Sequence, residues 1–216
     1  MPRLLSIFDG TGSLSRVFEQ AGWEVQTLDL DGRYGATIVS DIRKWDYSNE
    51  PAPDVLWAGC PCEQYSIART RARTPRNFEL ADSLVSRTWM IIEHFLNLNP
   101  DMIYFIENPA SSLLWGRKVS EAFPTRIILD YCSYGTMYRK RTKLATNSNY
   151  DPRPLCNPKL CHACRDGKHV KTAQKGPTKG NDYSVDVCSL DELHAYPKEL
   201  CEDICRYCSN QLWQVL

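Results

Sequence analysis

Residues 4–12 read LLSIFDGTG, a short apolar run followed by an acid and two glycines. An apolar run of this length that stops at a turn is typical of a buried strand. Residues 14–21 follow with helical spacing and end at Gly22, a common helix stop. Glycines between a strand and a helix let the backbone approach a ligand, beside the free N–H groups of the helix start. The stretch predicts a ligand-binding turn, although Gly-x-Gly alone also fits an ordinary tight turn.

The same alternation of strands and helices continues along the first two-thirds of the chain. Further strands are expected at residues 23–28, 37–39, 54–58, 102–106, 126–131 and 143–146, and a long helix at residues 79–98. Such alternation predicts an α/β fold whose mostly parallel sheet is covered by helices on both faces. Ligands bind beyond the carboxyl ends of such strands. Asp9, Asp29, Cys62 and Glu107 all fall at those ends, so we expect one active site there.

The composition changes after residue 148. Residues 149–196 are rich in cysteine and lysine and predict a small irregular module, separate from an α/β domain at residues 1–148. Residues 197–216 predict a final helix that packs back on that domain. Its three cysteines, Cys201, Cys205 and Cys208, share one helical face, which favours burial over metal binding.

Composition and charge limit the class of protein. No apolar run reaches the roughly 20 residues that a membrane-spanning helix needs, and residues 1–8 resemble a strand and not a signal peptide. We therefore expect an intracellular, monomeric protein without membrane contact. Ten cysteines in such a compartment favour metal binding or catalysis over disulfides. Basic loops at residues 65–76 and 139–143 fit either a phosphate-binding strip or solvated surface.

A Gly59-Cys60-Pro61-Cys62 turn follows the strand at residues 54–58. Proline fixes φ, so the turn presents the next side chain at the edge of the sheet. Cys62 could act there as a nucleophile once deprotonated, with nearby arginines lowering its pKa. Alternatively, both cysteines are small buried fillers or half of a metal site.

Two acids complete this picture. Asp29, at the end of the second strand, could accept hydrogen bonds from ribose hydroxyls. Glu107 begins a Glu-Asn-Pro sequence, and a buried carboxyl group at this position could hold a proton against a ring nitrogen. The alternative role of this sequence is a helix cap before Ser111 and Ser112.

Four motifs occur in order along the chain: FDGTG at residues 8–12, GCPCEQYS at 59–66, ENP at 107–109, and Tyr134-Gly135 followed by RKR at 139–141. They resemble the ordered motifs of the cytosine-C5 DNA methyltransferase family, especially its compact phage and viral forms. The resemblance covers residues 4–147. It implies a Rossmann-like, S-adenosylmethionine-dependent methyltransferase fold with a small Cys-rich module appended. The Arg-x-Arg pair lies one residue closer to Gly135 than in most members.

The resemblance implies a DNA (cytosine-5-)-methyltransferase acting on a base flipped out of duplex DNA. Cys62 would attack C6 of cytosine, Glu107 would bind N3 and the exocyclic amine, and Arg141, or alternatively Arg139, would contact the carbonyl. The residues implied around S-adenosylmethionine are Phe8, Asp9, Gly10, Gly12, Leu14, Asp29, Leu30, Asp41, Ile42 and Pro61. The residues expected to contact DNA are Gln64, Ser66, Arg69, Arg71, Arg73, Arg76, Lys168 and Lys171.

The tail predicts a structural Zn²⁺. Cys156, Cys161, Cys164 and His169 have the residue types and spacing of tetrahedral zinc ligands. A module of this size has little room for a core, which a metal would replace. His162 or a distant cysteine could supply the fourth ligand instead, and the alternative to a metal site is a loop of free thiols.

Two other functions stay open. The same chemistry could act on RNA or on a free pyrimidine nucleotide, because residues 149–196, which the resemblance implies to be the target-recognition module, form only a short segment. A catalytically silent nucleic-acid-binding module on the same fold is the second alternative, and the presence of both Cys62 and Glu107 argues against it.

Overall fold

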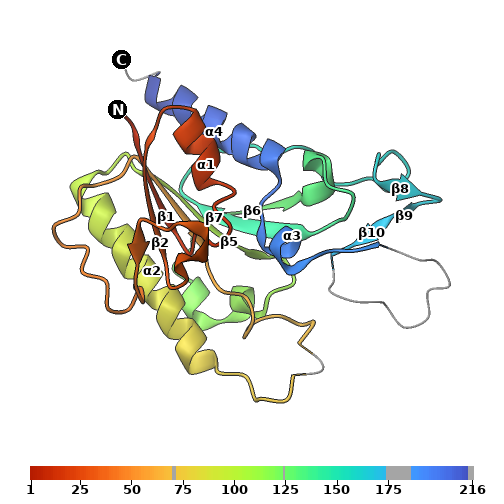
Figure 1. Ribbon diagram of the computed structural model, residues 1–216, viewed down its shortest axis with the longest axis horizontal. Coiled ribbons are helices and arrows are strands. Elements are labelled where there is room, and N and C mark those ends of the chain that lie inside the picture. Colours follow the sequence, from red (N-terminus) through yellow and green to blue (C-terminus); the bar gives the residue numbers. More distant parts are fainter. Residues whose placement is uncertain (70–71, 124, 174–185, 214–216) are drawn as a thin grey trace.

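The computed structural model describes residues 1–69, 72–123, 125–173 and 186–213. Seven strands form one sheet in the order β3-β2-β1-β4-β5-β7-β6 (Figure 1). The parallel strands are β1 (Arg3–Ile7), β2 (Glu24–Asp29), β3 (Ile38–Val39), β4 (Val55–Gly59) and β5 (Ile103–Pro109). The remaining strands are β6 (Thr125–Asp130) and β7 (Arg141–Thr146), with β7 antiparallel to both neighbours. The predicted α/β fold with a mostly parallel sheet is confirmed.

Helices cover both faces of the sheet. α2 (Phe78–Leu98) lies on one face, whereas α1 (Ser15–Gln20) and α4 (Lys198–Trp213) contact each other on the opposite face (Figure 1). Successive strand residues point to opposite faces. Accordingly, Leu56 packs in the core beneath α2, and Trp57 packs in the core beneath α1 and α4. The sheet is therefore buried on both sides, and its strand ends are left for ligands.

The sequence predicts the buried face of α4. Cys201, Cys205 and Cys208 are all buried in the core that α4 shares with α1. Leu200 and Ile204 are fully buried beside them. These cysteines pack as small apolar side chains.

Short elements fill the rest of the chain. The 3₁₀ turns are η1 (Gly32–Tyr34), η2 (Leu113–Gly116), η3 (Lys118–Ser120) and η4 (Tyr131–Tyr134). The tail contains the hairpin β8 (Cys164–Arg165) and β9 (Lys168–His169), the pair β10 (Lys171–Thr172) and β11 (Asp186–Val187), and α3 (Leu190–His194). No helix within these described ranges is long and apolar enough to cross a membrane.

Candidate active site

A cleft of about 1540 Å³ opens at the carboxyl ends of β1, β2, β4 and β5. The four residues expected to carry the chemistry, Cys62, Glu107, Arg139 and Arg141, all line it. Of the residues implied around the cofactor, those that line the cleft are Phe8, Asp9, Gly10, Asp29, Leu30, Asp41, Ile42 and Pro61. One edge of the sheet thus gathers side chains from sequence positions 100 residues apart.

Two expected cofactor residues lie elsewhere. Leu14 is 1% exposed and packs with Phe18 and Trp23 in the core beneath α1 and α4, so its side chain is turned away from the strand ends. Gly12 adopts a positive φ of 68° and donates its N–H to the Asp9 carbonyl at 3.1 Å. Neither lines the cleft, as far as the described residues define it. The structure therefore assigns Gly12 to shaping the turn and Leu14 to the core.

The turn after β1 is held by hydrogen bonds to two acids. The Gly10 N–H donates to Asp29 Oδ2 at 2.9 Å, which links the ends of β1 and β2. Asp9 turns inward, where its carboxylate accepts hydrogen bonds from Ser6 Oγ at 2.6 Å and Ser15 Oγ at 2.8 Å. Burial raises the pKa of Asp9. The Asp9 carboxylate therefore braces the turn, and Asp29 joins the turn to the end of β2 at the wall of the cleft.

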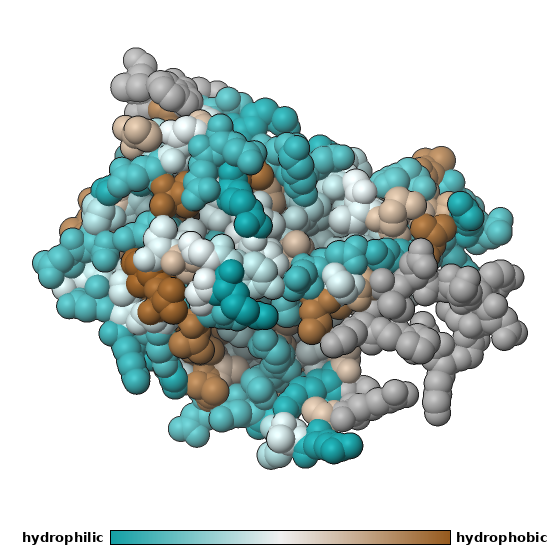
Figure 2. Space-filling view, viewed as in Figure 1, coloured by the Kyte–Doolittle hydropathy of each residue, from teal (hydrophilic) through white to brown (hydrophobic). Residues whose placement is uncertain are grey.

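Apolar surface and charge alternate along the part of the cleft that follows β2 and β3. Leu30 follows β2 and is 73% exposed, and Leu80 at the start of α2 is 37% exposed. Figure 2 shows that apolar groups of this kind interrupt an otherwise hydrophilic face. Asp41 pairs with Arg43, whose hydrogen bonds hold the pKa of that carboxyl at about 2. Ile42, beside it, is almost fully buried.

The turn after β4 is fixed from three sides. Asn108 Nδ2 donates to the Cys60 carbonyl at 2.7 Å, and the Asn108 side chain is fully buried. Cys60 Sγ lies 3.9 Å from Thr88 Oγ1 in α2, so Cys60 packs against the helix. On the other side, a Cβ at position 59 would overlap the hydroxyl of Tyr196, which leaves room only for glycine. These contacts position the loop that carries Cys62.

The environment of Cys62 differs from the expected one. Burial raises the pKa of the Cys62 thiol to about 11, and the negative charges of Glu107 and Glu63 raise it further. Lys140 is the cation that opposes this increase. The expectation that nearby arginines lower this pKa is therefore wrong for the unliganded protein.

The arginines expected to act on Cys62 bind inside their own loop instead. Arg69 donates to Thr74 Oγ1 at 2.7 Å, and Arg76 donates to the carbonyls of Gln64 and Ser66 at 2.6 and 2.8 Å. These bonds join Arg69 to Thr74, and Arg76 to the residues just after Cys62. They also engage guanidinium groups that the sequence predicts to face DNA.

The remaining predicted DNA contacts are spread over the surface. Ser66 lines the cleft and Arg73 is exposed, while Arg71 lies outside the described residues. Lys168 is exposed on β9, and Lys171 forms an ion pair with Glu192 at 2.5 Å. The geometry does not gather these residues into one strip.

Glu107 is almost fully buried and has a partner that the sequence reasoning missed. Thr142 Oγ1, on the neighbouring strand β7, donates to Glu107 Oε1 and lies 3.0 Å from the Asn108 carbonyl. The alternative of a helix cap does not apply, because Ser112 caps η2 with its own side chain. A strand over residues 141–146 would have revealed Thr142, since the residue next to Arg141 must face the opposite side.

Three basic residues at the start of β7 and directly before it line the cleft. Arg141 donates two hydrogen bonds, at 2.9 and 2.7 Å, to the buried carboxylate of Asp130. Lys140 Nζ donates to the Leu193 carbonyl at 2.9 Å. Arg139 forms no ion pair within the described residues. Arg141 is thus rigidly placed, and Arg139 is the more available charge.

Tyr196 is a further cleft residue that the sequence reasoning missed. It is partly buried, packs edge-on against Trp57 with ring centroids 5.0 Å apart, and donates its N–H to Ser13 Oγ at 2.9 Å. The segment before α4 therefore touches both the turn after β1 and the turn after β4. Its only sequence signal is an aromatic residue immediately before the helix-starting Pro197.

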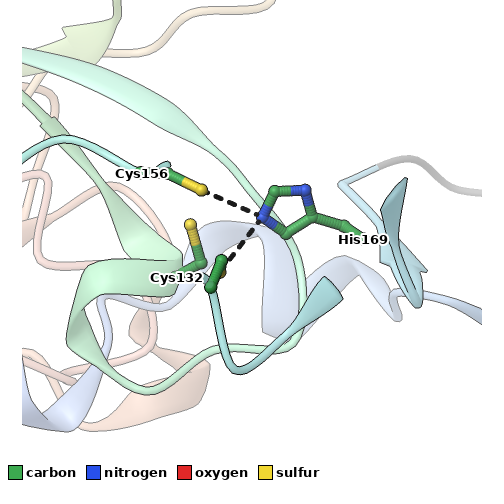
Figure 3. A group of neighbouring side chains, drawn as sticks. Cys132, Cys156 and His169 are labelled. Carbon is green, nitrogen blue, oxygen red and sulfur yellow. Dashed lines mark hydrogen bonds between the residues drawn. The ribbon is translucent and has the colours of Figure 1, made fainter. Parts of the chain in front are cut away.

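The tail brings four possible metal ligands together. Cys132, Cys156, Cys161 and His169 place one ligand atom each within 4.8 Å of one another. Figure 3 shows His169 pointing toward Cys156 and Cys132. The fourth position is filled by Cys132 in η4, a distant cysteine, and Cys164 is not in this group. Cys164 begins β8 and so lies in the hairpin that carries His169.

Comparisons with known proteins show the fold. No protein-family model matches the chain, and no curated protein matches it. Among solved structures, a methyltransferase from Entamoeba histolytica, EhMeth, has a TM-score of 0.52 and 14% identity, with 72% of this chain and 56% of that chain covered. A DNA modification methyltransferase encoded within an E. coli prophage has a TM-score of 0.45 and 14% identity, covering 68% and 46%. A Spodoptera frugiperda DNMT2 mutant has a TM-score of 0.46 and 11% identity, with 71% of this chain and 53% of that chain covered.

The chain spans about half the length of these solved structures. Its seven-stranded sheet with one antiparallel strand and helices on both faces is the fold of S-adenosylmethionine-dependent methyltransferases. The fold that the sequence resemblance implies is therefore confirmed.

Proposed function

We propose that this protein is an S-adenosylmethionine-dependent methyltransferase that methylates C5 of cytosine in DNA. One observation carries the proposal: Gly59, three residues before Cys62, lies directly opposite Glu107 in the register of β4 and β5. A potential nucleophile and a buried carboxyl group thus share one cleft with the turn at Gly10. A thiol, a proton-holding group and a nucleotide-binding turn are the parts that this reaction requires.

The residues around the turn fit the cofactor. Asp29 accepts N–H bonds from Gly10 and Asp31 and retains lone pairs for ribose hydroxyls. Leu30 offers exposed apolar surface for adenine, and Asp41 and Ile42 lie across the cleft to contact its edge. When bound, S-adenosylmethionine supplies the methyl group and a positively charged sulfonium.

Cys62 and Glu107 then carry the chemical steps on the cytosine ring. Cys62 releases its thiol proton to water, and Sγ forms a bond to C6 of cytosine. The electrons of the C5–C6 double bond shift toward N3, which takes up a proton through the Glu107 carboxyl group. C5 becomes nucleophilic and takes the methyl group. Water in the cleft takes the C5 proton, the N3 proton returns to Glu107, and departure of Cys62 Sγ as a thiolate restores the C5–C6 double bond. Thr142 holds Glu107 in place, and Asn108 holds the turn that carries Cys62.

The raised pKa of Cys62 fits this sequence of events. Burial and Glu107 disfavour the thiolate, so the Cys62 thiol stays protonated near neutral pH. Positive charge favours the thiolate. The sulfonium of a bound cofactor would add positive charge to that of Lys140 and so promote deprotonation of Cys62. Reactivity of Cys62 is coupled in this way to cofactor binding.

The test is methyl transfer from labelled S-adenosylmethionine to duplex DNA, followed by location of the label on the base. We expect label on cytosine C5, loss of transfer in Cys62→Ala, and retained transfer in the matched variant Cys60→Ala, since Cys60 packs against α2. Label on another atom, or full activity of Cys62→Ala, would contradict the proposed mechanism.

A second candidate keeps the chemistry and changes the substrate to RNA or a free pyrimidine nucleotide. The engagement of Arg69 and Arg76 inside their own loop favours it, because it leaves fewer cations for a duplex. Parallel assays with duplex DNA, tRNA and cytidine nucleotides separate the candidates. Trapping of Cys62 by 5-fluorocytosine DNA would also exclude a catalytically silent binding module.

A further inference from the structure

The cluster of Cys132, Cys156, Cys161 and His169 lies outside the cleft and has no part in methyl transfer. His169 Nε2 lies 3.5 Å from Cys156 Sγ and 3.6 Å from Cys161 Sγ (Figure 3). A tetrahedral zinc ion with Zn–S of about 2.3 Å and Zn–N of about 2.0 Å holds sulfur and nitrogen about 3.5 Å apart. Both observed separations match that value.

Hydrogen bonding alone is a poorer explanation of this geometry. A single imidazole nitrogen has one proton or one lone pair in the ring plane, so it forms one well-directed hydrogen bond. Here the same nitrogen faces two sulfurs, and the third sulfur, of Cys132, lies within 4.8 Å of all of them. None of these cysteines forms a disulfide. One cation between four ligand atoms accounts for all the contacts together.

The local backbone is shaped to bring the ligands together. A turn at Asp166 and Gly167, both with positive φ, reverses the chain so that β9 returns beside β8 and places His169 near Cys161. The backbone N–H of Cys164 donates to the Cys161 carbonyl at 3.0 Å and closes the turn that carries Cys161.

The same segment has almost no apolar core of its own. Ala163 is its one fully buried apolar residue among residues 156–169, and Leu160 is 84% exposed. Segments that cannot bury enough apolar surface commonly depend on a metal or disulfides for a fixed structure. The position of these residues therefore needs a source of stability that packing does not supply.

We propose that Cys132, Cys156, Cys161 and His169 bind one structural zinc ion that fastens residues 156–169 to the catalytic sheet. Three sulfurs and one imidazole nitrogen form a closed tetrahedral set, which is typical of structural and not catalytic zinc. Cys132 is the essential part of the proposal, because it lies in η4, directly after β6. The ion thereby joins the tail to the sheet, whereas a set built with Cys164 would only close the tail upon itself.

This attachment extends toward the cleft. The backbone N–H of Cys156 donates to Asp130 Oδ2 at 3.0 Å, and the same carboxylate holds Arg141, which lines the cleft. Asp130 thus links the zinc ligand Cys156 to Arg141 in the cleft. The ion holds Cys156 in place and so stabilises the position of Arg141.

The test uses the full-length chain purified without added metal or chelator. We expect about one zinc per chain by elemental analysis, and an X-ray absorption spectrum that fits three sulfur neighbours and one nitrogen neighbour. Cys164→Ser serves as the matched control and should keep both its zinc and its spectrum. Cys132→Ser should lose most of its zinc.

Several results would overturn the proposal. They are wild-type protein without near-stoichiometric zinc, a first shell with two or four sulfurs, or loss of zinc from Cys164→Ser. The spectrum of the wild type and the behaviour of Cys164→Ser decide the question even if Cys132→Ser does not fold.

Discussion

The raised pKa of Cys62 predicts an unusually unreactive thiol in the unliganded protein. At a pKa of about 11, about one Cys62 in a thousand is a thiolate at pH 8, against about a quarter of ordinary thiols with a pKa of about 8.5. A more basic thiolate is intrinsically more nucleophilic, which offsets about a factor of ten of this difference in thiolate fraction. We therefore expect alkylation of Cys62 to be roughly twentyfold slower than that of an ordinary exposed cysteine at pH 8.

The assay is alkylation by iodoacetamide between pH 7 and pH 10, followed by peptide mass spectrometry. Tryptic cleavage yields residues 45–69 as one peptide whose only cysteines are Cys60 and Cys62, and a Cys60→Ala background leaves a single thiol in it. The rate should rise about tenfold per pH unit across the whole range, since the titration lies above it. A plateau below about pH 9 would refute the assignment of a raised pKa.

Two substitutions and one comparison of ligands test why the pKa of Cys62 is raised. Glu107→Gln removes a negative charge that raises the pKa of Cys62, so alkylation at pH 8 should become faster, and Glu63→Gln should act in the same direction to a smaller extent. S-adenosylmethionine should accelerate alkylation relative to S-adenosylhomocysteine, which fills the same site without the sulfonium charge. Slower alkylation of Glu107→Gln, or identical rates with the two ligands, would contradict the proposed electrostatics.

Three further predictions concern stability and positioning. Asn108→Ala removes the 2.7 Å hydrogen bond to the Cys60 carbonyl; urea unfolding should show a loss of about 1–3 kcal/mol, and kcat should fall more than KM rises. Gly59→Ala should cost about 1–3 kcal/mol by overpacking, and Tyr196→Phe in the same chain should restore most of that loss because it removes the overlapping hydroxyl; no restoration would disprove the contact. Burial alone would raise the pKa of Asp130, but its hydrogen bonds lower it below the ordinary value, so its stabilisation is present above about pH 4 and is lost as pH falls further; Asp130→Asn should flatten that acid limb in unfolding measured from pH 2 to pH 7.

The sequence predicts the sheet well because local patterns determine it. Apolar runs that end at turns mark each parallel strand, and the long helix at residues 79–98 differs by one residue from the observed α2. The motif positions also predict which strand ends meet, since parallel strands in one sheet place their carboxyl ends at one edge. These features depend on neighbours along the chain.

Contacts between segments that are far apart in the sequence could not be predicted from it. Leu14 has the right place in a motif, but α4 covers its face of the sheet and makes it a core residue. Cys132 stands alone in the sequence, and the end of β6 brings it to the other ligands. Tyr196 reaches the turn after β1 across most of the chain. Each of these depends on where a late segment packs, which no local pattern records.

The place of α4 has a consequence for how the protein is made. One face of the sheet, including Trp57 and Phe105, is covered only by α1 until residues 198–213 are available, and the cleft lacks Tyr196 until the segment before α4 has been made. Synthesis proceeds from the N-terminus, so the central sheet must wait for the last helix before it can bury that face. A nascent chain arrested before α4 would expose this apolar face to chaperones. A separate peptide of α4 should bind to the truncated chain and complete its fold.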